Sequence, residues 1–329
     1  MGIETALIGS LPRPPILSKY VGRFRSGKIS EVVLERKYVV YTKRALSKLI
    51  SMGYKVVTDG MFRHDDILNP FISFIDGVKV NGLYRFYENN FFFRIPIIED
   101  MIKLKKNVPL ITWYLKAKEI VSEVTKEEVI IKPVIPGPAT FVSHSINMYY
   151  KDLGKFIADY VANVLEPLIG GLKKVGADVI EIHEPALVAS RLKPKVIDLS
   201  LRGIYELSES LGVKIWLQVY FGSLRRLVKY LKPGADLILS LDLVESPEDI
   251  RLLKVLKGVT ESIALGIVDA RNTKIERFKE MKRVVDKALR YSFKDIYLCP
   301  NTLLDFLPEV IAYRKLRKLA RFVKAFRGD

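Results

Sequence analysis

The chain has 329 residues, 49% of them hydrophobic, and its 54 lysines and arginines against 37 acidic residues give a formal net charge of +17. No apolar run approaches the roughly 20 residues that a membrane span needs, and the N-terminal segment lacks the basic and apolar stretches of a signal peptide. We therefore expect a soluble, cytoplasmic protein whose charge attracts anions.

Cys299 is the one cysteine in the chain. This excludes a disulfide framework within the chain and a cysteine-rich zinc cluster. Because Cys299 lies in an apolar run, "IYLC", we interpret it as a small buried hydrophobic side chain rather than a nucleophile.

Eight short β-prone apolar runs recur along the chain, and most intervals between them contain an amphipathic helical stretch, such as 155–176. The runs are 5–9, 55–60, 130–138, 178–185, 214–222, 236–243, 262–269 and 295–302. Apolar strands that alternate with helices are typical of a parallel sheet covered by helices, and eight such units fit an α/β fold of the (β/α)8 TIM-barrel type. A doubly wound open sheet is the alternative, but no Gly-x-Gly-x-x-Gly motif supports its dinucleotide-binding form.

Two intervals are longer than one helix requires. Residues 11–54 predict two helical pieces, which would form an N-terminal helical extension of the barrel. Residues 61–129 contain an aromatic-rich stretch with an Asn81-Gly82 turn signal, which predicts a hairpin-bearing insertion after the second strand. Insertions of this kind lie on the carboxyl-terminal face of a barrel, where active sites form. No linker interrupts the chain, so we expect residues 1–329 to form a single domain.

Two helical stretches allow more detailed expectations. Residues 246–258 begin with Ser246 as the N-cap, Pro247 at the first helical position and acids in the first turn. Residues 314–327 hold seven basic residues and no acid, and their apolar residues recur at helical spacing. This pattern predicts an amphipathic helix with one face on the core, whose basic face is either solvated or a docking surface.

Polar residues follow or end seven of the eight predicted strands. Burying such groups without partners costs a few kcal/mol each. Each has a possible structural reason, such as capping the next helix, but together they predict a polar pocket at the mouth of the barrel. They are Ser10, Arg13, Asp59, His183, Glu184, Gln218, Tyr220, Asp242, Asp269 and Asn301.

Several motifs follow one another in a recognisable order: "IGSLPRPP" from residue 8, "PGPATF" from 136, "EIHEPALV" from 181, "YFG" from 220, "LDLV" from 241 and "GIVDARN" from 266. With them the chain resembles cobalamin-independent methionine synthase from about residue 5 to 310. The resemblance implies methyl transfer from a methyl-folate, usually polyglutamylated, to homocysteine activated on zinc. It also implies two related barrels, of which the C-terminal one holds zinc and homocysteine and the N-terminal one helps to bind the acidic tail of the folate.

The zinc ligands of the family fall on unsuitable residues in this sequence. The resemblance places them on Gln218, Tyr220 and Thr302, and at or next to Leu241, with Asp242 one step away. Zinc that activates a thiol requires thiolate and imidazole ligands, which these residues do not supply. We therefore expect this chain to hold no metal, no cofactor of its own and no catalytic residue.

The amino-acid site of the family is changed as well. Its glutamate after the second strand falls on Met61, and its aspartate before "EPAL" falls on His183. Neither side chain can balance the ammonium group of homocysteine, since a thioether is neutral and a protonated histidine repels it.

The N-terminal barrel of the family is the better match, for instance at "GMFRHDDILN" from residue 60 and "RFYENNFFFRIPII" from residue 85. The resemblance places one tail-binding lysine on Arg85 and a second basic position on or near Lys19, with Arg13 close by. Cations at these places can hold a γ-glutamyl carboxylate by charge-assisted hydrogen bonds. The expected substrate-binding residues are Arg13, Lys19, Arg85, His183, Glu184, Tyr220, Asp242 and Asp269.

The leading hypothesis is a barrel of methionine biosynthesis that binds a polyanionic donor, methyl-tetrahydrofolate or methyl-tetrahydropterin. It would act with a separate zinc-bearing catalytic barrel, the only place where zinc is expected. The alternative is an enzyme of the uroporphyrinogen decarboxylase or corrinoid methyltransferase type, which acts on an acidic substrate. Nucleic-acid binding rests on net charge alone, so we expect neither nucleic acid nor a membrane as a partner.

Overall fold

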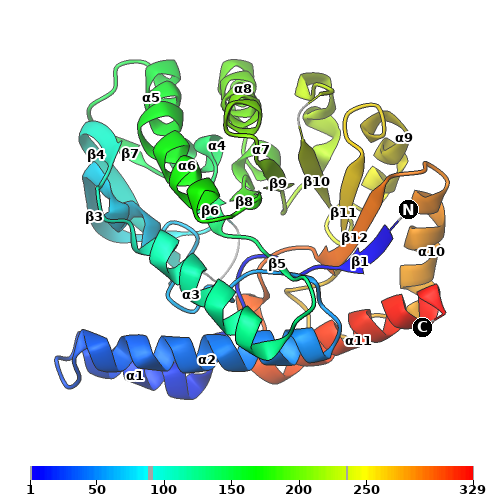
Figure 1. Cartoon of the computed structure of the whole chain (residues 1–329). Helices are drawn as coiled ribbons and strands as arrows, with labels where there is room; N and C mark the ends of the chain where they lie inside the picture. Colours follow the sequence, from blue (N-terminus) through cyan, green and yellow to red (C-terminus); the bar gives the residue numbers. More distant parts are fainter. Residues whose placement is uncertain (1, 88–91, 235, 329) are drawn as a thin grey trace.

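The computed structural model describes residues 2–87, 92–234 and 236–328, and a parallel sheet forms its centre (Figure 1). Every pairing between neighbours in this sheet is parallel. Its seven strands lie in the order β1 (Gly2–Thr5), β12 (Asp295–Pro300), β11 (Ser262–Val268), β10 (Leu237–Asp242), β9 (Lys214–Gln218), β8 (Val179–His183) and β6 (Val134–Pro136).

A second, two-stranded ladder of β2 (Val56–Val57) and β5 (Ile130–Ile131) connects to both edges of this sheet. Ala6, directly after β1, forms a parallel bridge with Val56, and β5 is followed by β6 after only two intervening residues. The eight predicted runs thus all contain or overlap strands, and the expected parallel α/β architecture is confirmed. Between the two ladders the described pairing is limited to that bridge, so the fully closed barrel stays a prediction.

The first strand differs from its expected position. It begins at Gly2, three residues before the predicted run, and pairs with Asp295–Leu298 of β12. The chain leaves the sheet soon afterwards because Gly9 adopts a left-handed conformation (φ +50°), in which a side chain would collide with Leu303.

Successive residues of the strands pack on opposite faces of the sheet. Ile215 and Leu217 belong to the large core between sheet and helices, whereas Trp216 belongs to a smaller cluster. Since this cluster contains no helical residue, it occupies the inner face of the curved sheet. It consists of Ala6, Ile8, Val56, Val179, Trp216, Ile238, Ala264 and Cys299. Cys299 is therefore the buried hydrophobic side chain that the sequence predicts.

Helices cover the outer side of the sheet (Figure 1). The predicted stretch 155–176 is confirmed by α5 (Leu153–Tyr160) and α6 (Glu166–Lys174), which a short π-helical turn (Val161–Leu165) joins. The helices after the hairpin are α3 (Pro109–Val124), α4 (Pro138–Ser143), α5 (Leu153–Tyr160), α6 (Glu166–Lys174), α7 (Ala186–Ala189), α8 (Pro194–Leu211), α9 (Leu253–Leu256), α10 (Phe278–Leu289) and α11 (Glu309–Arg327). No helix in the described ranges combines the length and the apolar composition that a bilayer-spanning segment needs.

The N-terminal extension and the hairpin are both present. The extension consists of α1 (Pro15–Arg25) and α2 (Glu31–Ser51), as predicted. The hairpin pairs β3 (Ile75–Arg85) with β4 (Phe92–Leu104), and the short β7 (Ile146–Asn147) joins β4 in parallel.

The predicted turn of the hairpin is wrong. Asn81 and Gly82 lie inside β3, where Asn81 pairs with Ile95 and the register shifts before Leu83. Gly82 has a positive φ of 65°, which suits a β-bulge as well as a turn. Asn-Gly therefore marks a bulge here.

The helix predicted over 246–258 is only partly confirmed. Pro247 begins a 3-10 helix (Pro247–Leu252) that continues into α9, but the Ser246 side chain caps no backbone group of this helix. The first-turn acid Asp249 instead accepts hydrogen bonds from Ser223 Oγ (2.6 Å) and Leu224 N (2.6 Å). It ties this helix to the loop after β9.

The amphipathic character of α11 is confirmed on its apolar side. Leu316, Leu319, Phe322 and Val323 are buried, and Phe326 is partly buried. The basic side is not uniformly exposed, because Lys315 is fully buried and pairs with Glu276 at 2.5 Å.

Replacing Leu319 by alanine tests this packing. Leu319 is fully buried, so Leu319→Ala should leave a cavity and lower the free energy of unfolding by about 2–5 kcal/mol. Arg321 is exposed on the same helix, and Arg321→Ala should change that free energy by less than about 0.5 kcal/mol. Urea unfolding followed by circular dichroism measures both variants, and equal losses would contradict the packing.

Candidate functional site

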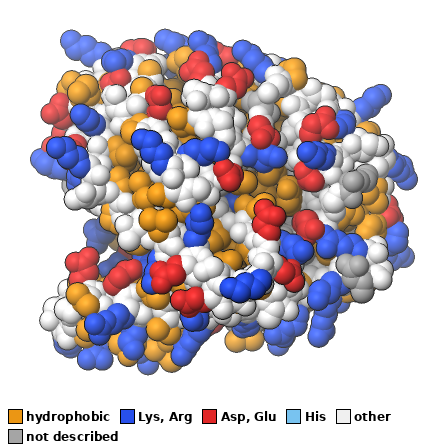
Figure 2. All heavy atoms as spheres, viewed as in Figure 1, with side chains coloured by type: hydrophobic (Ala, Val, Ile, Leu, Met, Phe, Trp, Pro, Cys, Tyr) orange, Lys and Arg blue, Asp and Glu red, His pale blue; other side chains and the backbone are white. Residues whose placement is uncertain are grey.

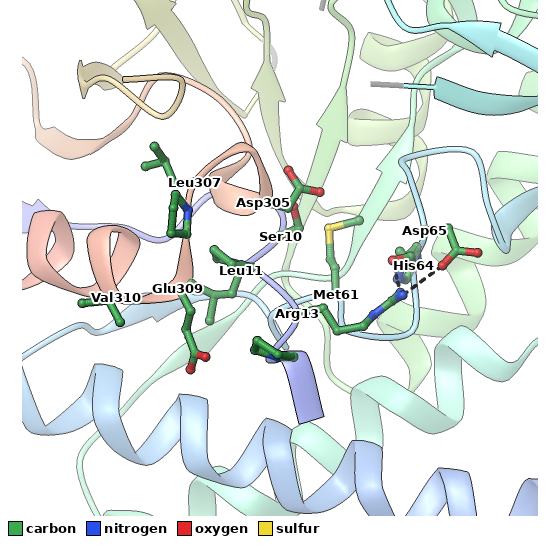
Figure 3. A pocket seen from close by; sticks show the side chains of 13 residues that line it. Ser10, Leu11, Arg13, Met61, His64, Asp65, Asp305, Leu307, Glu309 and Val310 are labelled. Atoms are coloured by element: carbon green, nitrogen blue, oxygen red, sulfur yellow. Dashed lines mark hydrogen bonds and ion pairs between the residues drawn. The ribbon is translucent and has the colours of Figure 1, made fainter. Parts of the chain in front are cut away.

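An open pocket of about 530 Å³ lies at the carboxyl-terminal end of the sheet (Figure 3). Three segments line it, 10–15 after β1, 61–65 after β2 and 305–310 after β12. These segments meet because β1 neighbours β12 in the sheet and bridges to β2. The pocket is therefore at the end of the fold where the sequence predicts a site.

Two buried side-chain oxygens, one of a hydroxyl and one of a carboxyl group, line this pocket. Ser10 Oγ and Asp305 Oδ1 are both buried, and neither has a hydrogen-bond partner within the described residues. They lie near one another in Figure 3. Burial raises the pKa of Asp305 to about 6, and the Ser10 hydroxyl opposes this effect because it can turn to donate a hydrogen bond to the carboxylate. Buried polar groups normally have partners, so this pair suits a ligand that donates hydrogen bonds.

Arg13 forms part of the rim and is fixed there by the protein itself. Its guanidinium donates to Phe62 O (2.9 Å), His64 O (2.5 Å) and Asp65 Oδ1 (3.0 Å). Arg25 also binds Asp65. Burial lowers the pKa of His64 to about 4, so this ring is neutral at pH 7. Arg13 thus shapes the loop after β2, and its expected contact with a ligand stays a prediction.

The other two expected cations lie outside the lining of this pocket. Lys19 is exposed on α1, and Arg85 is exposed at the end of β3. Their role in holding a tail therefore also stays a prediction.

A lysine and a glutamate on the inner side of the curved sheet form a buried ion pair that the sequence analysis does not predict. Lys132 Nζ is 2.5 Å from Glu181 Oε2, and both side chains have no exposed surface. The other carboxylate oxygen accepts a hydrogen bond from Gly9 N (2.8 Å) and lies 2.5 Å from His183 Nε2. Lys132 Nζ also lies 3.5 Å from the centre of the Trp216 ring. We call these four side chains the central cluster.

Protonation in the central cluster follows from burial and from the ion pair. Burial lowers the pKa of Lys132, while Glu181 opposes this effect. Burial alone would raise the pKa of Glu181, but Lys132 and His183 hold it below its usual value.

The sequence contains a signal for this ion pair. The runs "IIKPVI" and "VIEIH" each place one charged residue within an apolar run, and charged residues are rarely buried unless they are paired.

His183 and Tyr220 are both fully buried and touch each other. His183 Nδ1 lies 3.2 Å from the Tyr220 hydroxyl. Neither residue lines the open pocket, so a substrate would have to displace part of the structure to reach them.

Glu184 points the opposite way from His183 and caps α4. Its carboxylate accepts hydrogen bonds from Ala139 N (2.8 Å), Thr140 N (2.7 Å) and Thr140 Oγ1 (2.7 Å). A β-carbon on Gly137 would lie 2.3 Å from the Glu184 carboxyl carbon. The glycine of the "PGP" turn is therefore required to make room for Glu184.

Asp242 and Asp269 stabilise loops. Asp242 accepts from Phe221 N (3.0 Å), Glu245 N (2.9 Å) and Asn301 Nδ2 (3.0 Å). Asp269 is half-buried and accepts from Arg271 N (2.9 Å). The expected substrate contacts of both residues stay predictions.

The residues at the family's zinc positions do not fit zinc. Gln218 is engaged with Trp216 Nε1 (2.9 Å) and the Asn301 carbonyl (3.3 Å). Burial raises the pKa of the Cys299 thiol far above its usual range, so it supplies no thiolate. In the part of the chain that the structure describes, no group of three or more His, Cys, Asp or Glu side chains is arranged to hold a metal ion.

Residues 77–292 match the family model described as "Cobalamin-independent synthase, N-terminal domain". The chain belongs to this family. The predicted resemblance is confirmed, including its likeness to the N-terminal barrel.

Curated relatives extend the similarity over nearly the whole chain. The methionine synthase of Sulfolobus acidocaldarius is 28% identical over 323 residues, which cover 97% of this chain and 91% of that protein. The methionine synthase of Pyrococcus abyssi is 27% identical over 329 residues, 99% of this chain and 94% of that protein.

Solved structures share the fold. A B12-independent methionine synthase from Shewanella sp. W3-18-1, in complex with selenomethionine, superimposes with a TM-score of 0.77 at 18% identity, covering 100% of this chain and 98% of that one. A putative B12-independent methionine synthase from Listeria monocytogenes gives a TM-score of 0.76 at 19% identity, over 99% of this chain and all of the other.

The buried ion pair predicts an asymmetric mutational response. Lys132→Met leaves the Glu181 carboxylate buried without its countercharge, so it should lower the free energy of unfolding by about 3–5 kcal/mol. The double variant Lys132→Met/Glu181→Gln removes both charges and should recover part of this loss. Denaturant unfolding measures both variants, and a single variant as stable as the wild type would contradict the pairing.

Glu184 makes the free energy of unfolding depend on pH. Burial raises its pKa from 4.5 to about 7 in the folded chain, so above about pH 4.5 the unfolded chain loses a proton that the folded chain keeps. The stabilisation is complete below about pH 4.5 and is lost as the pH rises through about 7, by up to about 3 kcal/mol.

Glu184→Gln should remove this dependence. The difference in unfolding free energy, wild type minus variant, should therefore fall as the pH rises from about 4.5 to about 7. Urea unfolding of both proteins at pH steps across this range measures it. A difference that stays flat or rises would show that Glu184 is already ionised in the folded chain.

Proposed function

We propose that this chain is a zinc-free barrel of the methionine synthase type, with its eight β/α units closed into a (β/α)8 barrel. It binds the acidic tail of a methyl-tetrahydrofolate or methyl-tetrahydropterin and acts with a separate zinc-bearing barrel that transfers the methyl group to homocysteine. The observation that carries this proposal is the match of residues 77–292 to the N-terminal domain of the family.

The side chains in the interior support the proposal that this barrel binds the donor while a second barrel carries out the methyl transfer on zinc. Activation of a thiol on zinc requires thiolate and imidazole ligands. Here the corresponding places hold an amide, a phenol and an alcohol, at Gln218, Tyr220 and Thr302. The chemical step therefore belongs to a partner.

The charge of the chain supports an anionic ligand. The net charge is +17, and basic side chains are spread over the face seen in Figure 2 with acidic ones between them. Such an excess attracts a polyanionic donor and raises its rate of encounter, most strongly at low salt. The expected cations at Arg13, Lys19 and Arg85 would hold tail carboxylates by charge-assisted hydrogen bonds.

Calorimetric titration tests the binding part of the proposal. The purified chain should bind a methyl-tetrahydropterin with three γ-glutamates at least about tenfold more tightly than the same pterin with one, a gain of about 1.4 kcal/mol. Because the contacts are ionic, the gain should shrink as salt increases. Binding that is independent of tail length and of salt would contradict the proposal.

Methionine formation tests the division of labour. The chain alone should form none, and mixing it with a zinc-bearing barrel of the same family should give activity that depends on both proteins. Stoichiometric zinc and methionine formation by the chain alone would overturn the proposal. Turnover of an acidic porphyrin by the chain alone would instead support the uroporphyrinogen decarboxylase type.

A further inference from the structure

A second cavity, of about 320 Å³, adjoins the pocket at the carboxyl-terminal end of the sheet. The two cavities share Pro15 and Glu309 in their linings. The second cavity is enclosed by the start of α1, the segment 41–48 of α2, and the start of α11. The two cavities therefore lie side by side, with Pro15 and Glu309 at their common boundary.

Two cations from α2 line the second cavity, Arg44 and Lys48. The guanidinium carbon of Arg44 lies 5.0 Å from the centre of the Tyr41 ring, and Lys48 Nζ lies 3.4 Å from the centre of the Tyr313 ring. Tyr41 and Tyr313 also line the cavity. The rings hold both cations in place by cation–π contacts.

The positive charge in this cavity is not balanced by an ion pair. Within the described ranges, neither Arg44 nor Lys48 has a carboxylate oxygen within 4.0 Å, whereas their neighbour Lys43 pairs with Glu123 at 2.6 Å. Like charges four residues apart on a helix repel each other. Partial burial lowers the pKa of Lys48; Glu309 is the next largest influence and opposes this shift, and Arg317 adds to it. A bound anion would bring negative charge to both cations.

We propose that the acidic tail of the donor binds across the two cavities, with its carboxylates at Arg44 and Lys48. This rests on the proposed function and adds residues that the family resemblance does not indicate. A γ-glutamyl chain offers two kinds of group that match the two cavities. Its carboxylates suit the cations on α2, and its amide N–H groups suit the unsatisfied oxygens of Ser10 and Asp305.

Replacing Glu309 should have the opposite effect on tail binding from replacing the two cations. It is the acid that lines the second cavity, and its side chain points away from Asp305 in Figure 3. Since it reduces the positive charge there, Glu309→Gln should tighten the binding of a tail with three γ-glutamates.

The decisive experiment compares tail-length dependence between variants by calorimetry. Arg44→Ala/Lys48→Ala should lose most of the affinity gain between one and three γ-glutamates, a loss of at least about tenfold. Arg36 is exposed on the same helix outside the cavity, so Arg36→Ala is the matched control and should keep the gain. Lys19→Ala and Arg85→Ala, measured in parallel, show how much of the affinity gain depends on the two cations that the family resemblance indicates. Unfolding midpoints confirm that each variant is folded.

The outcomes separate this inference from the proposed function. If the wild type shows no tail-length dependence, the proposed function fails and the inference with it. If the wild type shows the dependence and Arg44→Ala/Lys48→Ala retains it, the inference alone is overturned. Competition by inorganic tripolyphosphate as effective as by free tri-γ-glutamate would also overturn it, since the cavity would then be an unselective anion site.

Discussion

The buried ion pair between Lys132 and Glu181 is the interaction on which the arrangement of the inner side of the sheet depends. An unpaired charge in such a place costs several kcal/mol, so β8 and the segment between β5 and β6, which carry the pair, must be held together for either residue to be tolerated. Glu181 also binds Gly9 N and His183. One carboxylate therefore connects the β5–β6 segment, β8 and the loop after β1, and it fixes where that loop leaves the sheet.

Because the central side chains bind one another, the open pocket lies at the edge of the sheet, between the loops after β1, β2 and β12. His183, Tyr220 and Gln218 are used within the protein, and Asp242 closes a further chain of hydrogen bonds through Asn301. Each of these side chains already has a partner within the protein, so a metal ion or a substrate would have to replace it. The unsatisfied oxygens of Ser10 and Asp305 lie instead beside the loops after β1 and β12. The chain thus keeps the fold of its family, while the side chains at its centre bind one another.

The sequence predicts the strands well and their polar contacts poorly, for a physical reason. Strands buried on both faces must be apolar along their whole length, so all eight are visible as runs. Asn81-Gly82 misleads because a left-handed residue serves a bulge and a turn alike. Lys132 and Glu181 are 49 residues apart in the chain, and no local pattern shows that one neutralises the other. The open pocket is built from three segments spread over almost the full length of the chain, so its composition emerges only with the fold.

The same reasoning applies to the large positive charge. A net charge draws anions toward the molecule, but it does not show where they bind, because most surface cations are compensated locally. Arg13 illustrates this, since the carboxylate of Asp65 and two carbonyl oxygens occupy its guanidinium. Arg44 and Lys48 differ in that aromatic rings, rather than carboxylates, support them. A ring stabilises a cation without neutralising it, and the charge stays available to a ligand. For a strongly basic protein, the informative cations are therefore those that the fold holds in place without a counterion.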